Sequence, residues 1–218
     1  MESKVFPEIY DSFRIHLLER SDAIAPLQLT GRLENYLVHE FISHVHKETD
    51  GEFLGISNFG NNGEQKYDIA FVRNNHEKKK EIVYALEAKY IMNNHKLREK
   101  EDATDDITTT LKNLANQLKS DIKNKHGIYD VCPQKVGDKI YGLVFASCRK
   151  SNYGDESKEK FFGRILSVAK KMGFTCYGSN EEEPIFDEGY EDIEVFAVGD
   201  KYYLTLRVGL WQLNASYG

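Results

Sequence analysis

Three ionisable residues lie within two stretches of sequence that otherwise have the composition of β-strands. Asp68 falls in KYDIAFVR (66–73), and Glu87 and Lys89 fall in EIVYALEAKYI (81–91). The pattern acid-x-lysine alone carries little information, because it occurs six times in the chain and its composition predicts roughly three by chance. Glu87 differs from the other five acids because it follows an apolar run (IVYAL), where an ionised carboxylate is costly unless it has a partner.

The spacing of these residues favours one chemistry. Strand alternation puts Glu87 and Lys89 on the same face, about 7 Å apart. If the two strands form a hairpin centred between Glu77 and Lys78, Asp68 lies opposite Glu87, with the Cβ atoms about 5 Å apart. Carboxylates that close repel each other unless a cation lies between them, and Mg²⁺ is typically held by one or two carboxylates plus waters.

Lys89 would then lie next to the ion. Its ammonium could hold a water nucleophile, help to remove its proton, or neutralise charge that builds on a phosphate. These groups together suit metal-assisted hydrolysis of a phosphodiester. The alternative is a cross-strand salt-bridge cluster that has no catalytic role.

The order of these residues resembles the PD-(D/E)xK nuclease superfamily, which has the restriction-endonuclease-like fold. The pattern is Asp68, eighteen residues, then Glu87-Ala88-Lys89 across a hairpin, followed by a helix and a strand. The resemblance covers about 31–147. It implies that Asp68 and Glu87 bind a metal, often with the backbone carbonyl of Ala88, and that Lys89 serves the water or the transition state.

The resemblance also implies residues outside the hairpin. Many members add a glutamate from a preceding helix, for which Glu34 and Glu40 are the candidates. Glu34 shares a helical face with Leu37 and Phe41, although an acid in the first turn is also favoured by the helix dipole alone. Glu40 is expected on a solvated face. Gln117, on the long helix, matches a place where some members carry a glutamine near the metal; the alternative is an exposed polar residue.

Hydrophobic periodicity and turn residues predict the order of the elements. Helices are expected over 8–19, 31–46, 104–123 and 158–172, and strands over 53–57, 66–73, 81–91, 140–147, near 174, and over 193–198 and 202–208. The helix over 104–123 carries an apolar stripe formed by Ile107, Leu111, Leu114, Leu118 and Ile122. This order predicts a mixed α/β (α+β) fold in which helices flank a central mixed β-sheet with a restriction-endonuclease-like core.

The length of 218 residues suits one nuclease-like domain, 1–218. Its core is expected at about 31–147, with a carboxy-terminal α/β elaboration at about 148–218. No apolar run approaches the ~20 residues that cross a bilayer, and the amino terminus lacks a signal-peptide pattern, so we expect a cytoplasmic protein without membrane contact. The three cysteines have neither disulfide nor zinc-site spacing. His39, His44 and His46 are expected to be solvated.

The charge distribution leaves a nucleic-acid partner open. The net charge is −6, but eight acids and no base lie between Glu181 and Glu194, and without them the sum would be +2. A nucleic-acid site needs only a local basic surface. Lysines at 78–80, bases at 96–100 and the pair Arg149-Lys150 flank the predicted site, as phosphate contacts or merely as solvated loops.

These observations predict a Mg²⁺-dependent endonuclease, with Mn²⁺ as a substitute ion, that hydrolyses DNA phosphodiester bonds as a restriction enzyme or another defence nuclease. A homodimer is expected because cutting both strands of a duplex usually requires two sites. One alternative is a structure-specific resolvase or repair nuclease with the same site. The other is a catalytically silent nuclease-fold module that binds nucleic acid or a protein.

Overall fold

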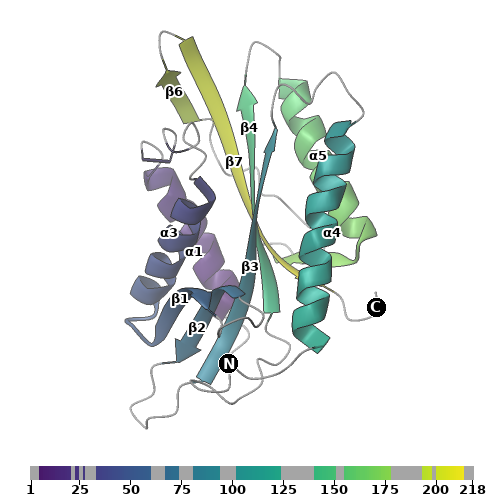
Figure 1. The fold of residues 1–218 in the computed structure, drawn as a ribbon. Coiled ribbons are helices and arrows are strands. Elements are labelled where there is room, and N and C mark those ends of the chain that lie inside the picture. Colours follow the sequence, from purple (N-terminus) through teal and green to yellow (C-terminus); the bar gives the residue numbers. More distant parts are fainter. Residues whose placement is uncertain are drawn as a thin grey trace.

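The computed structural model describes residues 5–20, 23–24, 27, 33–59, 67–73, 81–93, 102–123, 140–150, 155–177, 193–197 and 200–213 (Figure 1). The elements are α1 (Val5–Glu19), α3 (Leu33–Glu48), β1 (Phe53–Phe59), β2 (Tyr67–Arg73), β3 (Glu81–Asn93), α4 (Asp102–Lys123), β4 (Ile140–Lys150), α5 (Asp155–Lys171), β5 (Phe174–Tyr177), β6 (Ile193–Ala197) and β7 (Asp200–Leu213). The predicted order of helices and strands is confirmed. β7 continues to Leu213, past the predicted end at residue 208.

The strands form one mixed sheet in the order β1-β2-β3-β4-β7-β5, and β6 pairs with β7. β3 and β4 are parallel, and the remaining pairs are antiparallel. The segment 148–218 therefore adds strands to the sheet that carries β2 and β3. The predicted mixed α/β fold with a helix-flanked sheet is confirmed, while a restriction-endonuclease-like core stays a prediction. Among the described helices, none has both the length and the apolar character required to span a membrane.

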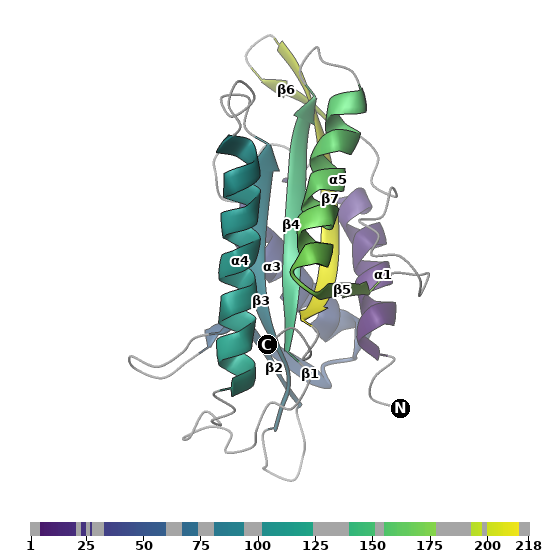
Figure 2. The same cartoon turned by 90° about the vertical axis from the view of Figure 1, so that its right-hand side faces the viewer.

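Two helical layers cover the sheet, α4 and α5 on one face and α1 and α3 on the other (Figures 1 and 2). Parallel strands cannot be joined by a tight turn, so the chain crosses from the end of β3 to the start of β4 through α4. α5 likewise carries the chain back from the end of β4 to the start of β5, in the same direction as α4. α4 and α5 consequently run parallel to each other and lie side by side.

The register of the β2–β3 hairpin confirms the predicted alignment of the two acids. Ile69 pairs with Leu86, and the same register continued by one residue would align Asp68 with Glu87. A β-bulge shifts the register further along the hairpin, beside Val72. The predicted alignment therefore holds on the side of the bulge that carries the acids.

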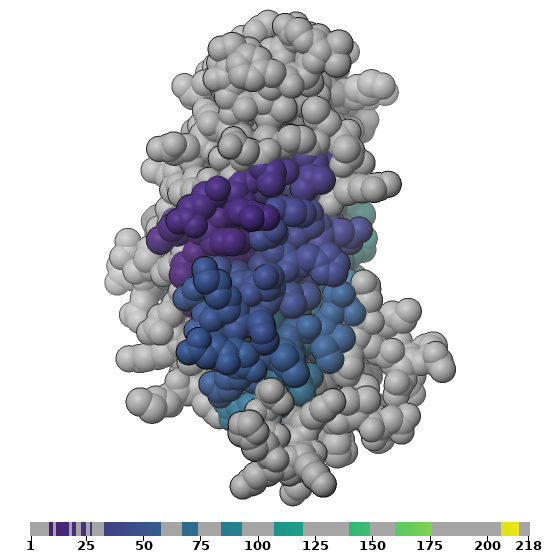
Figure 3. Space-filling view, turned by 90° about the vertical axis from the view of Figure 1, so that its left-hand side faces the viewer, coloured from purple at the N-terminus to yellow at the C-terminus, as the bar shows by residue number. Residues whose placement is uncertain are grey.

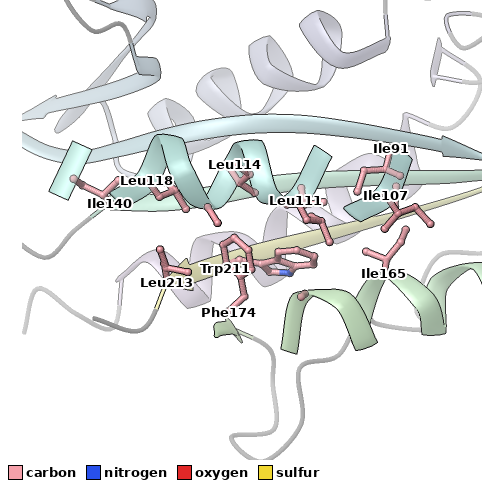
Figure 4. Close-up of a cluster of buried hydrophobic side chains, with 14 of the residues drawn as sticks. Ile91, Ile107, Leu111, Leu114, Leu118, Ile140, Ile165, Phe174, Trp211 and Leu213 are labelled. Atoms are coloured by element: carbon pink, nitrogen blue, oxygen red, sulfur yellow. The ribbon is translucent and has the colours of Figure 1, made fainter. Parts of the chain in front are cut away.

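The core beneath α4 and α5 forms from the predicted apolar stripe. Ile107, Leu111, Leu114 and Leu118 are buried against β3, β4 and β7, as labelled side chains show in Figure 4. Trp211 of β7 is completely buried and contacts Phe174 with ring centroids 5.4 Å apart. Ile122, the fifth residue of the stripe, has a side chain outside the described part of the structure.

The second core lies between the sheet and the helices α1 and α3, whose outer surface is shown in Figure 3. Phe13 of α1 meets Phe41 of α3 edge to face, with centroids 4.9 Å apart. The hydroxyl of Tyr10 donates a hydrogen bond to the backbone carbonyl of Val208 in β7. Each helix is therefore fixed to the other and to the sheet.

Polar side chains join α1 to α3 and correct one prediction. His44 is not solvated: it is 5% exposed, and its Nε2 lies 2.7 Å from Ser12 Oγ. His16 stacks on it with ring centroids 5.0 Å apart and contacts Glu40 at 2.8 Å. The surface of α1 buries His44, which the sequence of α3 alone does not reveal. His39 and His46 are exposed, as predicted.

Replacing Gly209 by alanine should destabilise the fold. A Cβ at this position would lie 2.3 Å from Nε1 of the buried Trp211, so the indole or the backbone must move. We expect the free energy of unfolding to fall by about 1–3 kcal/mol in urea denaturation. Gly163→Ala is the control: its Cβ meets nothing within 4 Å, and alanine in a helix should add about 0.5–1 kcal/mol. Equal stability of both variants would contradict the packing described here.

The burial of His44 predicts acid-sensitive stability. Burial lowers the pKa of His44, and the charge of His16 beside it lowers that pKa further; Glu40 and Glu48 oppose the shift and Lys47 reinforces it. Below about pH 6.5, the ordinary pKa of histidine, the unfolded chain binds a proton at His44 more readily than the folded chain does. The free energy of unfolding therefore decreases as the pH is lowered. His44→Gln should make the unfolding free energy depend less on pH between about pH 8 and pH 5. Replacing the exposed His39 by glutamine should leave this pH dependence unchanged.

Candidate active site

Asp68 connects the two strands of the hairpin through its carboxylate. Its Oδ2 accepts a hydrogen bond from the backbone N–H of Ala88 at 2.8 Å and lies 3.6 Å from Nζ of Lys89. The side chains of Asp68 and Lys89 are 35% and 24% exposed. An ion pair this accessible contributes at most about 1 kcal/mol to stability, so stability alone is a weak reason for these two charges.

Glu87 is 0% exposed within the central strand β3, where water cannot solvate its charge. Gln117 of α4 compensates in part, because its Nε2 donates a hydrogen bond to Glu87 Oε2 at 2.5 Å. Gln117 reaches the strand because it lies beside the buried stripe of α4, between Leu114 and Leu118. The structure therefore places Gln117 against the second predicted acid instead of leaving it exposed.

Glu34, at the start of α3, lies within electrostatic reach of the hairpin residues. Burial raises the pKa of Glu34 above its ordinary value; the charge of Lys89 and a backbone hydrogen bond from Tyr90 lower it, and the carboxylate of Asp68 raises it. The backbone contact with Tyr90 brings Glu34, on a helix that covers one face of the sheet, close enough to interact with the charges of Asp68 and Lys89 on the other face. Among the described strands, β3 has only β4 beside it from Lys89 to Asn93, so its other edge is open to α3.

Glu40, the other candidate acid, belongs to a different contact. Its two carboxylate oxygens meet His16 at 2.8 Å and Arg20 at 3.2 Å, on the α1 side of α3. Burial alone would raise the pKa of Glu40, but hydrogen bonds from His16 and Tyr36 and the charge of Arg20 together lower it. The expectation of a solvated Glu40 is therefore wrong, and its partners lie on α1, just after α1 and on α3 itself instead of on the hairpin.

The donor set of the hairpin suits a hard divalent cation. Asp68 and Glu87 offer carboxylate oxygens from neighbouring strands, next to the paired residues Ile69 and Leu86, and Mg²⁺ usually takes one or two carboxylates and keeps several waters. In an extended strand the N–H and C=O of one residue project to the same edge. Because the N–H of Ala88 faces Asp68, its carbonyl faces that edge too. Over the residues described, no group of three or more His, Cys, Asp or Glu side chains is arranged to hold a metal.

Two polar residues on the sheet, one in the hairpin and one on β7, escaped the sequence analysis. The hydroxyl of Tyr90 lies 2.5 Å from Oγ of the buried Ser147 in β4, so Tyr90 fixes β3 at the point where it contacts Glu34. Arg207 of β7 is 6% exposed, and its guanidinium lies 4.1 Å from the ring centroid of Phe162. Strand alternation could have indicated Tyr90, whereas the burial of Arg207 depends on α5.

The chain matches no family model, no curated protein and no solved structure.

Replacing Gln117 by alanine should reveal the cost of the buried carboxylate. The change removes a donor from Glu87, and a hydrogen bond to a charged group is worth about 1.5–3 kcal/mol. We expect the unfolding free energy to fall by about that amount in urea titrations, and the loss to shrink in the Glu87→Gln background. Asn116→Ala, an exposed neighbour on α4, should change stability by less than about 0.5 kcal/mol. A similar loss in both single variants would argue against the Gln117–Glu87 contact.

Proposed function

We propose that the protein is a metal-dependent endonuclease that hydrolyses DNA phosphodiester bonds. The observation that carries the proposal is the contact of Asp68 Oδ2 with both the Ala88 N–H and the Lys89 ammonium, beside the buried Glu87. This contact brings together a carboxylate that can bind a metal, the strand edge to which the Ala88 carbonyl points, and the ammonium of Lys89. The resemblance of Asp68 and Glu87-Ala88-Lys89 to the PD-(D/E)xK pattern supports it.

Asp68, Glu87 and the carbonyl of Ala88 would hold Mg²⁺, for which Mn²⁺ can substitute. When bound, such an ion polarises a phosphoryl oxygen and lowers the pKa of a bound water. Lys89, one quarter exposed, has a donor that can reach a water or a phosphate oxygen outside the strand. Glu34 suits proton transfer, because burial moves its pKa from its ordinary value toward neutrality. Gln117 would keep Glu87 oriented.

The biological role within this proposal is cleavage of DNA as a restriction enzyme or another defence nuclease. The chain length suits a compact stand-alone enzyme, and cutting both strands would require two copies of the site, hence a homodimer. A structure-specific resolvase or repair nuclease would use the same residues.

The complete burial of Glu87 favours a second candidate function. A carboxylate that is 0% exposed and bound by Gln117 must be released, at least in part, before it can bind an ion. If that release is too costly, the protein is a silent nuclease-fold module that binds nucleic acid or a protein. The two candidates differ in one observable, cleavage in the presence of a divalent metal.

Lys89→Ala should abolish plasmid cleavage without abolishing DNA binding. Removal of a group that acts on the water or the transition-state charge typically costs ~10²-fold or more in rate. The test is nicking of supercoiled plasmid in Mg²⁺ or Mn²⁺, with binding measured in Ca²⁺, for the wild type and for the Asp68→Asn, Glu87→Gln and Lys89→Ala variants.

The matched control is Lys47→Ala, which removes an exposed lysine of α3 on the other helical layer. It should cut at the wild-type rate. Binding without any cleavage by the wild type would support the silent module, and cleavage by Lys89→Ala at the wild-type rate would overturn the assigned role of Lys89. Circular dichroism of each variant establishes that the fold is intact.

A further inference from the structure

The two helical layers differ in charge. In α4 and α5, the described side chains over 107–119 and 160–171 include six bases and no acid. The bases are Lys112, Lys119, Lys160, Arg164, Lys170 and Lys171. In α1 and α3, the described side chains include four acids but two bases other than histidine. The acids are Glu19, Glu34, Glu40 and Glu48, and the bases are Arg14 and Lys47. In a protein with a net charge of −6, the described side chains of α4 and α5 therefore form a basic surface.

Helical spacing places the bases of α4 on one flank of that helix. Lys112 and Lys119 are seven residues apart, two turns along the same line. They lie on the opposite side of the buried stripe from Gln117, which faces β3 through its bond to Glu87. The flank that faces away from Gln117 is the one beside α5 (Figure 2).

Three of the four described bases of α5 lie on the flank that faces back toward α4, and Lys170 lies on the other flank. Lys160, Arg164 and Lys171 are spaced by four and seven residues and so share one line along the helix. Viewed along the helix axis, Arg164 lies on the same side of the buried face of α5 as Gln117 does of the buried stripe of α4. Because the two helices run parallel on the same face of the sheet, that flank of α5 faces α4. The five bases thus line the seam between α4 and α5.

In the sequence, the acids of the two helices are concentrated near the helix ends. The sequence places Asp102, Asp105 and Asp106 at the amino end of α4 and Asp155, Glu156 and Glu159 at that of α5, with Asp121 near the end of α4. Acids at an amino end are favoured by the helix dipole. Both helices start at the same end of the sheet, the end where β3 and β4 finish. The basic side chains of the two helices are therefore concentrated over the middle and carboxyl halves of the helices.

We propose that the seam between α4 and α5, lined by Lys112, Lys119, Lys160, Arg164 and Lys171, binds the phosphate backbone of duplex DNA. This rests on the proposed function and names the surface that presents the substrate to the site. From Lys160 to Lys171 the bases extend about 16 Å, at 1.5 Å per residue, which spans several phosphates of one strand.

The position of the site on the other flank of α4 agrees with this assignment. A helix with its side chains is about 10–12 Å wide, and the major groove of B-DNA is about 12 Å wide. A duplex with α4 in its major groove would place one backbone on the seam and the other near Asp68 and Lys89. The outward face of α4 carries exposed Asn113 and Asn116, whose amides can hydrogen-bond to base edges without introducing negative charge.

The test compares two charge reversals that change the net charge equally, Arg164→Glu in the seam and Lys47→Glu on α3. Binding of a short fluorescent duplex is measured by anisotropy in Ca²⁺ over a series of salt concentrations. Arg164→Glu should weaken binding and reduce the slope of log affinity against log salt by about one, the effect of losing one phosphate contact. Lys47→Glu should leave the slope at the wild-type value. Lys112→Glu/Lys171→Glu should reduce it by about two.

Equal effects of Arg164→Glu and Lys47→Glu would overturn the proposal, because they would reflect net charge alone, as would a wild type that binds no duplex at low salt. The outcome is separable from the nuclease proposal. A wild type that binds through the seam but never cuts would overturn the nuclease and keep the seam. If the wild type cuts DNA and the Arg164→Glu variant binds the duplex as tightly as the wild type, the nuclease proposal stands and the seam proposal is overturned.

Discussion

The parallel pairing of β3 with β4 is the constraint on which the rest of the structure depends. Parallel neighbours require a crossover connection, and α4 provides it on one face of the sheet. The crossover covers the middle of β3, which buries Glu87, and it also brings Gln117 to the carboxylate that it buries. The same element thus imposes the cost of a desolvated charge and supplies the hydrogen bond that offsets part of it.

Patterns local to one element could be predicted from the sequence. The stripe of α4 from Ile107 to Leu118 follows from helical periodicity, and the register that opposes Asp68 to Glu87 follows from a short loop and strand alternation. Both depend on neighbouring residues and on backbone geometry. The conformation of 74–80, the loop itself, lies outside the described residues.

Features that depend on how elements meet could not be predicted. Whether Glu34 or Glu40 would approach the hairpin depends on the rotation of α3 against the sheet, which Phe41 and the contacts with α1 decide. His44 is buried for the same reason: a helix from another part of the chain covers it. The basic seam was also missed, because a sequence scan finds charge runs in loops, whereas these bases become neighbours only when α4 and α5 lie side by side.

The β-bulge beside Val72 separates the hairpin into two mechanically distinct parts. A bulge absorbs one extra residue and restores pairing on either side of it. Changes of length or sequence in the connection that joins β2 to β3 would thus be accommodated on the distal side, without sliding Asp68 past Glu87.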